Sequence, residues 1–482
     1  WLGLVALVAY ILRATAGEEA VVEYASPFPD ECSPTVQFNT QADVLCIPPD
    51  LPYQQSLVGQ QLYKRRHRMK ALCRETHWIQ KRAPGFWYLH MTSLAMMPDQ
   101  RTVMVAYQAS ASDEGHTAQH LVTAVSHGQG RTWVRKRVVK LQDPPYHSTA
   151  VTAEDWYQGD VDQLPATLSS QNGHPGVVQA QQHVEERPLW GPALLKDGDR
   201  VWMFFSASRL CWKDQNTTDP DHWTPGGDVL AVNTGDGDQW SNPVTLLKHP
   251  VPGPEGGAPF VTANPPAVTA EGHWVLPFWA ESPKGSVCEW GRKAPRAGVL
   301  VSKDRGRTWT ASAPIRADGT WLIEGTVVPL DGGELLQLFR TTRGHIYQAR
   351  SLDGGMSWST PNRTGLPNPN SKVATAVLSN GEVVLAYNAH RKGGGYPEGT
   401  RALLFLATSA TRGHSWRELA HLEMGMAAGL RYHYPALLQV GCKLLVAYSV
   451  SWKEGYKPSE EESQEQIGLK IQIIHLGLHS RG

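Results

Sequence analysis

The sequence carries little charge, few cysteines and no long apolar run after its first residues. The 45 Lys and Arg residues balance 45 Asp and Glu, which removes the simplest electrostatic argument for nucleic acid or an anionic membrane surface as a partner. Beyond residue 12 no stretch is apolar enough to cross a membrane. What the chain does have is a hydrophobic share of 41% with 18 Trp, which excludes a disordered or collagen-like protein.

The cysteines include no CxxC pair, which argues against a thiolate zinc site. Six are present, namely Cys32, Cys46, Cys73, Cys211, Cys288 and Cys442. The first three cluster before the main body of the chain and favour at least one disulfide there, although sequence alone does not choose among the pairings. Cysteine usage of this kind is typical of an oxidising compartment.

The first 12 residues, WLGLVALVAYIL, are almost wholly apolar, and the small-x-small pattern ATA follows at 14–16. Such a run is too short to span a bilayer, and the pattern is typical of signal-peptidase cleavage. We therefore expect a signal peptide over 1–16, truncated at its start, and a secreted or secretory-pathway protein. A signal anchor or an unprocessed apolar end is the alternative. Sequons at Asn216 and Asn362 predict glycosylation of such a secreted chain.

A repeated turn motif organises the rest of the chain, in which 45 Gly and 34 Pro favour many short strands. The pattern S-x-D-x-G-x-x-W occurs at 302–309 and 351–358, and weaker copies lie at 126–133, 233–240 and 409–416. In this motif Gly supplies the positive φ of a tight turn, Asp accepts turn amides, and Trp packs back onto the sheet. The motif therefore has a structural role, and we assign it no part in catalysis.

The repeats predict an all-β fold, a six-bladed β-propeller over 84–478. Each unit of about 50 to 60 residues has room for the four strands of one blade. The wide gap between the first two copies accommodates one unit plus an insertion near 141–182, which is rich in Pro, Gly, Gln and His. An N-terminal segment containing cysteines, 17–83, precedes the propeller.

With these Asp boxes, and with the segments LFRTTRGHIYQARSLDGGMSW, GLPNPNS and RYHYPALLQ, the chain resembles the sialidase (neuraminidase) superfamily. It is most similar to a poorly characterised sialidase-like subfamily. The resemblance implies a Tyr nucleophile, a Glu beside it, an Asp acid/base and three Arg that hold the sugar carboxylate. A neutral Tyr suits this chemistry because an anionic nucleophile would be repelled by a carboxylate on the reacting carbon. Guanidinium groups bind that carboxylate bidentately.

Four residues of the C-terminal half match this pattern. Glu324 begins a stretch similar to the one that starts with the Tyr-activating Glu, and Arg340, after a strand and turn, matches the second Arg. Tyr432 lies in a frame similar to that of the nucleophile. Tyr434 is two residues further on, and the alternation of a strand places it on the same face as Tyr432. We therefore expect Tyr434 to be a substrate-binding residue. For each of these residues the alternative is an ordinary structural role.

Other site residues follow from the same resemblance. Asp113 lies in a polar loop like the one that holds the acid/base Asp, and a shift of the alignment by one residue would place Glu114 there. Arg401 matches the third Arg, with Arg391 as its competitor. Glu281 is a further candidate for substrate binding.

The first Arg of the family is absent. His90 occupies its position, and an imidazole offers one donor where a guanidinium offers a fork. The site could therefore bind sialic acid through Arg340 and Arg401, or it could be adapted to a uronic acid or a 2-keto sugar acid. Arg431 stands before the candidate Tyr, where it could lower the pKa of that Tyr or supply a substitute ligand for the carboxylate.

These observations predict a secreted exo-glycosidase of the exo-α-sialidase type, which hydrolyses a terminal acidic sugar from glycoconjugates with retention. The alternatives are a uronic-acid-specific glycosidase or polysaccharide lyase on the same fold, and a non-catalytic glycan-binding propeller. We expect an acidic-sugar-bearing glycan as partner, with no nucleic acid, no stable membrane span and no cofactor. A calcium ion is not supported by any EF-type spacing.

Overall fold

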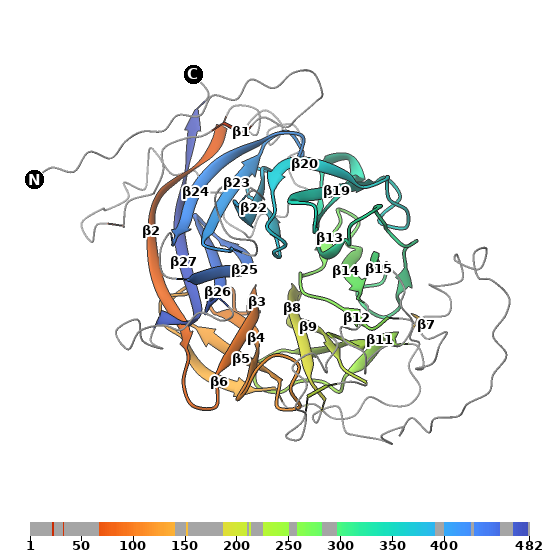
Figure 1. Cartoon of the computed structure of the whole chain (residues 1–482), viewed down its shortest axis with the longest axis vertical. Helices are drawn as coiled ribbons and strands as arrows, with labels where there is room; N and C mark the ends of the chain where they lie inside the picture. The colour runs from red at the N-terminus through yellow and green to blue at the C-terminus, as the bar shows by residue number, and fades with distance from the viewer. Residues whose placement is uncertain are drawn as a thin grey trace, which may run out of the picture.

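The computed structural model describes residues 22–23, 32, 67–139, 151–152, 187–209, 212–213, 225–249, 258–281, 296–390, 400–425, 429–453 and 466–480. The predicted signal peptide, all but two residues of the predicted insertion, Asn216 and Arg391 lie outside these ranges. Within them, six largely antiparallel sheets form a ring around a central axis (Figure 1), which confirms the predicted six-bladed propeller. The described ranges contain no helix that is long and apolar enough to cross a membrane.

The first three blades follow one another along the chain. Blade 1 contains β3 (Tyr88–Met96), β4 (Val103–Ser110), β5 (His120–Ser126) and β6 (Val134–Val138). Blade 2 contains β8 (Leu189–Asp197), β9 (Arg200–Ala207), β10 (Asp228–Thr234) and β11 (Val244–Lys248), with β7 (Val151–Thr152) parallel to β11. Blade 3 contains β12 (Phe260–Val261) and β13 (Ala267–Val268), which both pair with β14 (Trp274–Ala280), then β15 (Arg296–Ser302) and β16 (Thr310–Ala311).

The last three blades complete the ring. Blade 4 contains β17 (Ile323–Pro329), β18 (Leu335–Arg340), β19 (His345–Ser351) and β20 (Asn362–Pro367), with a 3-10 turn, η4 (Asp331–Gly333), between β17 and β18. Blade 5 contains β21 (Ala374–Val377), β22 (Val383–Asn388), β23 (Leu403–Ser409) and β24 (Trp416–Met424), with β1 (Val22–Glu23) parallel to β24. Blade 6 contains β25 (Leu430–Val440), β26 (Lys443–Trp452), β27 (Gly468–Ser480) and β2 (His67–Lys81).

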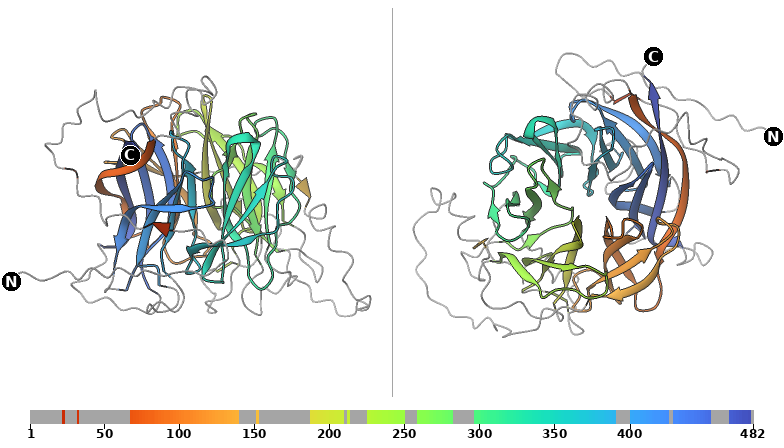
Figure 2. Two further views of the ribbon diagram at one scale, coloured as in Figure 1. Left: turned by 90° about the horizontal axis from the view of Figure 1, so that it is seen from above. Right: turned by 180° about the vertical axis from the view of Figure 1, so that it is seen from behind.

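The ring is closed by a strand from the N-terminal segment. β2 pairs antiparallel with β27 along its whole length and forms the outer strand of blade 6 (Figure 2). The sequence analysis set 17–83 apart from the propeller, and the structure corrects that boundary. The sequence does not predict β2 as a propeller strand because no Asp box lies next to it. A disulfide between Cys32 and Cys73 joins β2 to the preceding chain, which confirms one bridge among the first three cysteines.

The cores lie between neighbouring blades because each sheet is covered on both faces. Strands such as β9 and β14 are therefore almost continuously apolar. Between blades 5 and 6, for example, a row of side chains from β22, β23, β25 and β26 packs together. Around the axis a separate cluster draws on five blades and includes Met91, Trp190, Trp279, Ile323 and Tyr434. Tyr434, which belongs to the site described below, is thus part of a packed cluster around the axis.

The five repeated motifs form the turns between the third and fourth strands of blades 1 to 5. In the copy at 302–309, the Gly306 amide donates to Ser302 Oγ at 2.7 Å and Trp309 Nε1 donates to the Gly306 carbonyl at 3.2 Å. The copy near 233–240 uses Thr234 in place of Ser, one residue later than the sequence frame, and Gly237 donates to its hydroxyl at 2.9 Å. Blade 6 has no such turn because its fourth strand, β2, comes from far away in the sequence.

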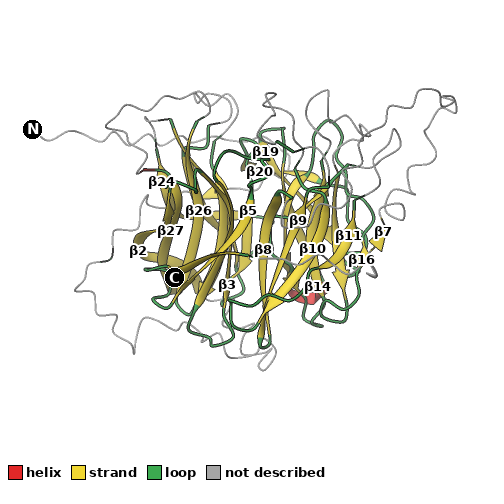
Figure 3. Ribbon diagram, turned by 90° about the horizontal axis from the view of Figure 1, so that it is seen from below, coloured by secondary structure: helices red, strands yellow, loops and turns green. Residues whose placement is uncertain are grey.

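The strand order separates these turns from the site described below. In a blade of antiparallel strands, the first strand begins, the second ends and the third begins at one end of the propeller. The turns from third to fourth strand lie at the opposite end. In Figure 3 the strands run between these two ends of the ring.

Candidate active site

The first strands of four blades carry the same β-bulge near the axis. The ladders slip between His90/Ser93, Trp190/Ala193, Ile323/Thr326 and His433/Ala436. In each bulge one residue adopts a positive φ, and these residues are Met91 (51°), Gly191 (53°), Glu324 (51°) and Tyr434 (57°). A bulge breaks the alternation of a strand and re-aims a side chain. The shared backbone feature thus brings one residue from each of four blades toward the axis.

Two of these residues, Glu324 of blade 4 and Tyr434 of blade 6, meet across the axis. The Tyr434 hydroxyl donates to Glu324 Oε1 at 2.5 Å. Arg340 Nη1, from the end of β18, lies 2.8 Å from the same carboxylate oxygen and donates to the Tyr434 hydroxyl oxygen, also at 2.8 Å. All three residues are less than 10% exposed. The site is therefore a phenol, a carboxylate and a guanidinium held together in a nearly water-free environment.

The charges of this triad are set by burial and by one another. Burial raises the pKa of Tyr434, the charges of Arg340 and Arg401 oppose that rise, and Glu324 adds to it. Burial acts to lower the pKa of Arg340, but Glu324, Tyr434 and Glu281 together outweigh it and raise that pKa. The phenol is therefore neutral and the guanidinium charged at neutral pH. A carboxylate that accepts the phenol proton is in place, and a cation already faces the phenol oxygen.

A second arginine lies beside the triad. Arg401 stands just before β23, and its Cζ is 5.6 Å from the centroid of the Tyr434 ring. Its Nη2 donates to the main-chain carbonyl of Asn370 at 2.8 Å, and the side-chain oxygen of Asn370 accepts from Arg340 Nε at 2.7 Å. Burial, followed by the charge of Arg340, lowers the pKa of Arg401 to about 10. Both arginines therefore stay charged at neutral pH.

Two histidines also lie next to the Tyr434 ring. The centroid of the His90 ring lies 3.9 Å from that of Tyr434, and His90 Nδ1 is 3.0 Å from the Ser449 hydroxyl. His433 Nδ1 is 3.2 Å from Arg401 Nη1, and its Nε2 is 2.9 Å from Ser451 Oγ. Because an arginine only donates, His433 accepts at Nδ1 and donates from Nε2.

Both imidazoles are neutral at neutral pH. Burial lowers the pKa of His90 well below its usual value, and Arg401 is the largest of the neighbouring charges that lower it further. Burial likewise lowers the pKa of His433, with His90 and Arg401 next among the causes. The position that holds the first arginine of sialidases, according to the resemblance, is thus occupied here by a ring without charge.

Three further carboxylates were predicted near the mouth. Glu114 hydrogen-bonds the Tyr88 phenol, and its charge also acts on Tyr434. Asp113 is exposed and forms an ion pair with Lys213 at 2.8 Å. Although partial burial acts to raise the pKa of Asp113, hydrogen bonding and the charge of Lys213 lower it. Of these two neighbours, therefore, it is Glu114 that the fold turns toward the tyrosine.

Glu281 lies at the end of β14 and is buried. Its Oε2 accepts a hydrogen bond from Trp279 Nε1 at 2.9 Å, and its charge acts on Arg340. The structure therefore brings Glu281 into the surroundings of the triad, where the sequence analysis placed it as a binding candidate.

The model of the BNR repeat-like domain matches residues 166–445, more than half of the sequence. The chain belongs to this family. Among curated proteins, none matches the sequence.

Solved structures share the fold of this BNR repeat-like protein. A protein of unknown function from Dyadobacter fermentans is 16% identical, with a TM-score of 0.56 over 86% of this chain and 99% of that one. A Hadza microbial sialidase is 15% identical, with a TM-score of 0.55 over 81% of this chain and 66% of its own length. Trypanosoma rangeli sialidase, solved with 2,3-difluorosialic acid as a covalent intermediate, is 11% identical, with a TM-score of 0.54 over 80% and 54%. At these identities the likeness establishes the sialidase fold, and the chain spans about half to two thirds of the two sialidases.

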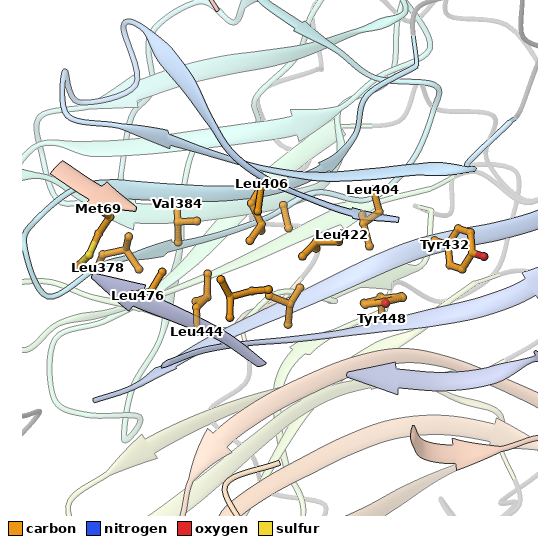
Figure 4. Close-up of a cluster of buried hydrophobic side chains, with 14 of the residues drawn as sticks. Met69, Leu378, Val384, Leu404, Leu406, Leu422, Tyr432, Leu444, Tyr448 and Leu476 are labelled. Atoms are coloured by element: carbon orange, nitrogen blue, oxygen red, sulfur yellow. The ribbon is translucent and has the colours of Figure 1, made fainter. Parts of the chain in front are cut away.

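Tyr432, the predicted nucleophile, is not the tyrosine that contacts Glu324 in this BNR repeat-like protein. That tyrosine is Tyr434. The ring of Tyr432 packs in the core between blades 5 and 6, 6.3 Å from the ring of Tyr448, at one end of the row of side chains in Figure 4. Burial, followed by the charge of Glu423, raises its pKa to about 12. The bulge after His433 is the reason, because it removes the alternation that would have kept both tyrosines on one face.

Three residues of the site were not singled out from the sequence, namely Asn370, Lys372 and His433. Lys372 is 1% exposed, and its Nζ donates to the carbonyl of Pro435, the residue after Tyr434, at 2.7 Å. Burial lowers the pKa of Lys372 to about 7, against the opposing charge of Glu324. The one available signal was the GLPNPNS segment, in which Asn370 adopts a left-handed conformation (φ 58°) that Asn tolerates well.

Proposed function

We propose that this BNR repeat-like protein is a retaining exo-glycosidase of the sialidase type, which hydrolyses a terminal acidic sugar from a glycan. The observation that carries the proposal is the 2.5 Å hydrogen bond from the Tyr434 phenol to Glu324, with Arg340 bonded to both. A neutral phenol beside a carboxylate base is an activated nucleophile. The role that the sequence analysis gave to Tyr432 therefore passes to Tyr434.

The reaction would proceed in two balanced steps. In the first, the Tyr434 oxygen attacks the anomeric carbon, its proton passes to Glu324, and the glycosidic bond breaks as the leaving oxygen takes a proton from the acid/base residue. In the second, that residue deprotonates a water molecule, which attacks the same carbon and releases the sugar, and the Tyr434 oxygen recovers its proton from Glu324. Arg340 stabilises the phenolate as charge develops on the oxygen that it already contacts.

The substrate class follows from the charges around Tyr434. Buried Arg340 and half-buried Arg401 offer two cations next to Tyr434, and guanidinium groups bind carboxylates well. Because the reacting sugar brings a carboxylate, a neutral nucleophile avoids the repulsion that an anionic one would meet. A sialic acid or a related acidic sugar fits this arrangement.

Glu114 is the better candidate for the acid/base. Its charge acts on Tyr434, whereas Asp113 is exposed and paired with Lys213. A carboxylate tied to an ammonium has a lowered pKa and is a weak proton donor at neutral pH. We therefore assign the acid/base role to the loop predicted from the sequence, but to Glu114 rather than Asp113.

We also propose that the protein is made in the secretory pathway. The disulfide between Cys32 and Cys73 supports this because such bonds persist in oxidising compartments. The sequon at Asn362 supports it as well, since Asn362 is exposed on β20, the last strand of blade 4. Treatment of secreted protein with a glycosidase specific for N-linked glycans should lower its mass, and an unchanged mass would contradict glycosylation.

The test of the activity combines turnover with trapping. Purified protein is offered a chromogenic sialoside beside chromogenic uronic-acid and 2-keto-acid glycosides, and then 2,3-difluorosialic acid. We expect hydrolysis of an acidic glycoside and a glycosyl adduct on the peptide containing Tyr434, located by mass spectrometry. Tyr434→Phe is the control and should take no label. An ultraviolet-absorbing unsaturated product would instead indicate a lyase, and binding without turnover would indicate a glycan-binding propeller.

A further inference from the structure

The chain between β20 and β21, residues 368–373, forms a tight internal turn at the axis. The Asn368 side chain closes it, since its Nδ2 donates to the Ser371 carbonyl at 2.8 Å and its Oδ1 accepts from the Ser371 amide at 3.1 Å. Asn368, Ser371 and Lys372 are each no more than 1% exposed. We call these residues the 368–373 turn. Its buried, self-bonded backbone is a rigid base for the side chains that it carries.

Asn370, in the middle of this turn, contacts both arginines of the site at once. Its side-chain oxygen accepts from Arg340 Nε, and its main-chain oxygen accepts from Arg401 Nη2. The two acceptors belong to one residue in a left-handed conformation, so their separation can vary only as far as the torsions of that residue allow. Arg340 comes from blade 4 and Arg401 from blade 5, and Asn370 joins them.

The same turn holds the bulge of Tyr434 directly and is linked to the bulge of Glu324 through Asn264. Lys372 Nζ donates to the Pro435 carbonyl, which belongs to the bulge of Tyr434. Asn264, from blade 3, donates from one Nδ2 to the carbonyls of Glu324, Gly325 and Val373 at 3.1, 3.0 and 3.2 Å. The bulge of Glu324 and the end of the turn therefore share one donor group.

We propose that the 368–373 turn is the positioning element of this site, with Asn370 setting the spacing of the arginines and Lys372 holding the bulge that presents Tyr434. Asn370 and Lys372 act through other residues, so both are positioning residues. The consequence for catalysis rests on the function proposed above. Arg340 keeps its Nη1 bonds to Glu324 and Tyr434 when only the Nε contact to Asn370 is lost. Asn370 therefore acts chiefly on how the arginines bind the substrate carboxylate, whereas Lys372 acts on Tyr434 and the chemistry.

The variant Asn370→Gly removes only the side-chain contact. Glycine accepts the left-handed conformation, and the main-chain oxygen that binds Arg401 remains. We expect KM for the acidic glycoside to rise about 10-fold or more, with kcat within about threefold, because a lost hydrogen bond to a charged group corresponds to about tenfold or more in binding. Gln100→Gly is the matched control, since Gln100 is also left-handed (φ 58°) but lies in the turn after β3. It should leave both constants unchanged.

The variant Lys372→Met keeps the length of the side chain and removes the Nζ donor that holds the Pro435 carbonyl. We expect the opposite split, with kcat falling about 10-fold to 100-fold and KM within about threefold. A purely structural role would lower the melting temperature and the yield of both variants while leaving KM and kcat of the folded protein unchanged. That result, or the same split in both variants, would overturn the proposal.

A readout independent of turnover separates this inference from the proposed function. With ¹⁵N-labelled arginine, the Arg340 Nε proton bonded to Asn370 should exchange slowly with solvent in the parent and quickly in Asn370→Gly. If the parent hydrolyses no acidic glycoside, the proposed function fails while this measurement still tests the clamp on Arg340. If the Arg340 Nε proton exchanges equally slowly in Asn370→Gly, Asn370 does not hold Arg340 in place, even if the parent protein is active.

Discussion

The two ends of the propeller both use residues with positive φ, repeated from blade to blade, but in different ways. At one end the Asp-box turns repeat the backbone together with its side chains, as in Gly306 and Gly355, whose amides donate to Ser302 and Ser351. At the axis the four bulges repeat the backbone alone, and the residue at the bulge is Met91, Gly191, Glu324 or Tyr434.

The difference reflects what each end does. An Asp box performs the same task in every blade, closing a turn and docking a Trp, so the same residue types recur. A bulge at the axis places one residue of its blade at a shared space, and a site needs different residues there. The same residue types are thus repeated in the Asp boxes, where each blade forms its own turn. Different residue types occur at the bulges, where several blades contribute to one site.

The largest effect should come from the tyrosine at the axis. Tyr434→Phe removes the oxygen bonded to Glu324 and Arg340, and we expect kcat on an acidic glycoside to fall by at least about 10³-fold. Tyr432→Phe, two residues away in the core between blades 5 and 6, should stay within about threefold of the parent. Steady-state kinetics of both variants check this. Equal losses would mean that the bulge does not separate the two tyrosines functionally.

At the other end, a substitution should reduce stability but leave activity unchanged. Gly306→Ala places a Cβ 2.7 Å from Trp274 Cζ3 at φ +89°, so we expect a loss of roughly 2–4 kcal/mol in unfolding free energy with kcat of the folded protein unchanged. Gly272→Ala, at φ +82° with nothing within 4 Å, should lose only about 1–2 kcal/mol. Denaturant unfolding measures both, and equal losses would remove Trp274 from the explanation.

The buried Lys372 near the axis should make the stability of the protein depend on pH in the alkaline range. The pKa of Lys372 is lowered by burial to about 7, with Glu324 opposing. Between that pH and about 10, the unfolded chain binds a proton at this lysine that the folded chain does not, so stability rises with pH. The melting temperature of the parent relative to Lys372→Met should therefore increase from pH 7 to pH 9.5. Parallel curves for the two proteins would contradict a buried, neutral lysine.

The Asp boxes should show a smaller effect, in acid. Although slight burial acts to raise it, hydrogen bonds from Ser357 and Ser351 lower the pKa of Asp353 to about 2. A lowered carboxyl pKa stabilises the fold above the ordinary value near 3.8, and that contribution disappears as the pH falls through about 2. Asp353→Asn should therefore lose less stability than the parent between pH 4 and pH 2, as measured by thermal unfolding. An identical loss would show that this carboxylate does not stabilise its turn through charge.

The fold could be predicted because it is encoded locally. Each box spans eight residues, and its Ser, Gly and Trp act on one another within that span, as in 302–309. The boundary at β2 was missed because that strand pairs with β27, nearly 400 residues away, and no local motif marks the pairing. Short-range motifs therefore give the number of blades but not the strand that closes the ring.

The site could be predicted only in part, for the same reason. Glu324, Arg340 and Arg401 were identified and lie together, because each is close in sequence to a recognisable strand or turn. The choice between Tyr432 and Tyr434 depended on a bulge, and one extra residue reverses the face of a strand without leaving a signal in its composition. The burial of Lys372 could not be predicted from the sequence, because a lysine in a loop is ordinarily exposed and only the packing of the blades buries this one.

The pairing of β2 with β27 also sets an order of events during synthesis. At about 5–20 residues per second, β27 leaves the ribosome tens of seconds after β2. Until then a strand of 15 residues has no partner from blade 6, and an unpaired edge of that length is prone to join other chains. The Cys32–Cys73 disulfide joins residues that emerge early, so it can form while the ring is still open. The last blade to be made is thus completed by one of the first strands, and newly made chains depend on that strand staying available.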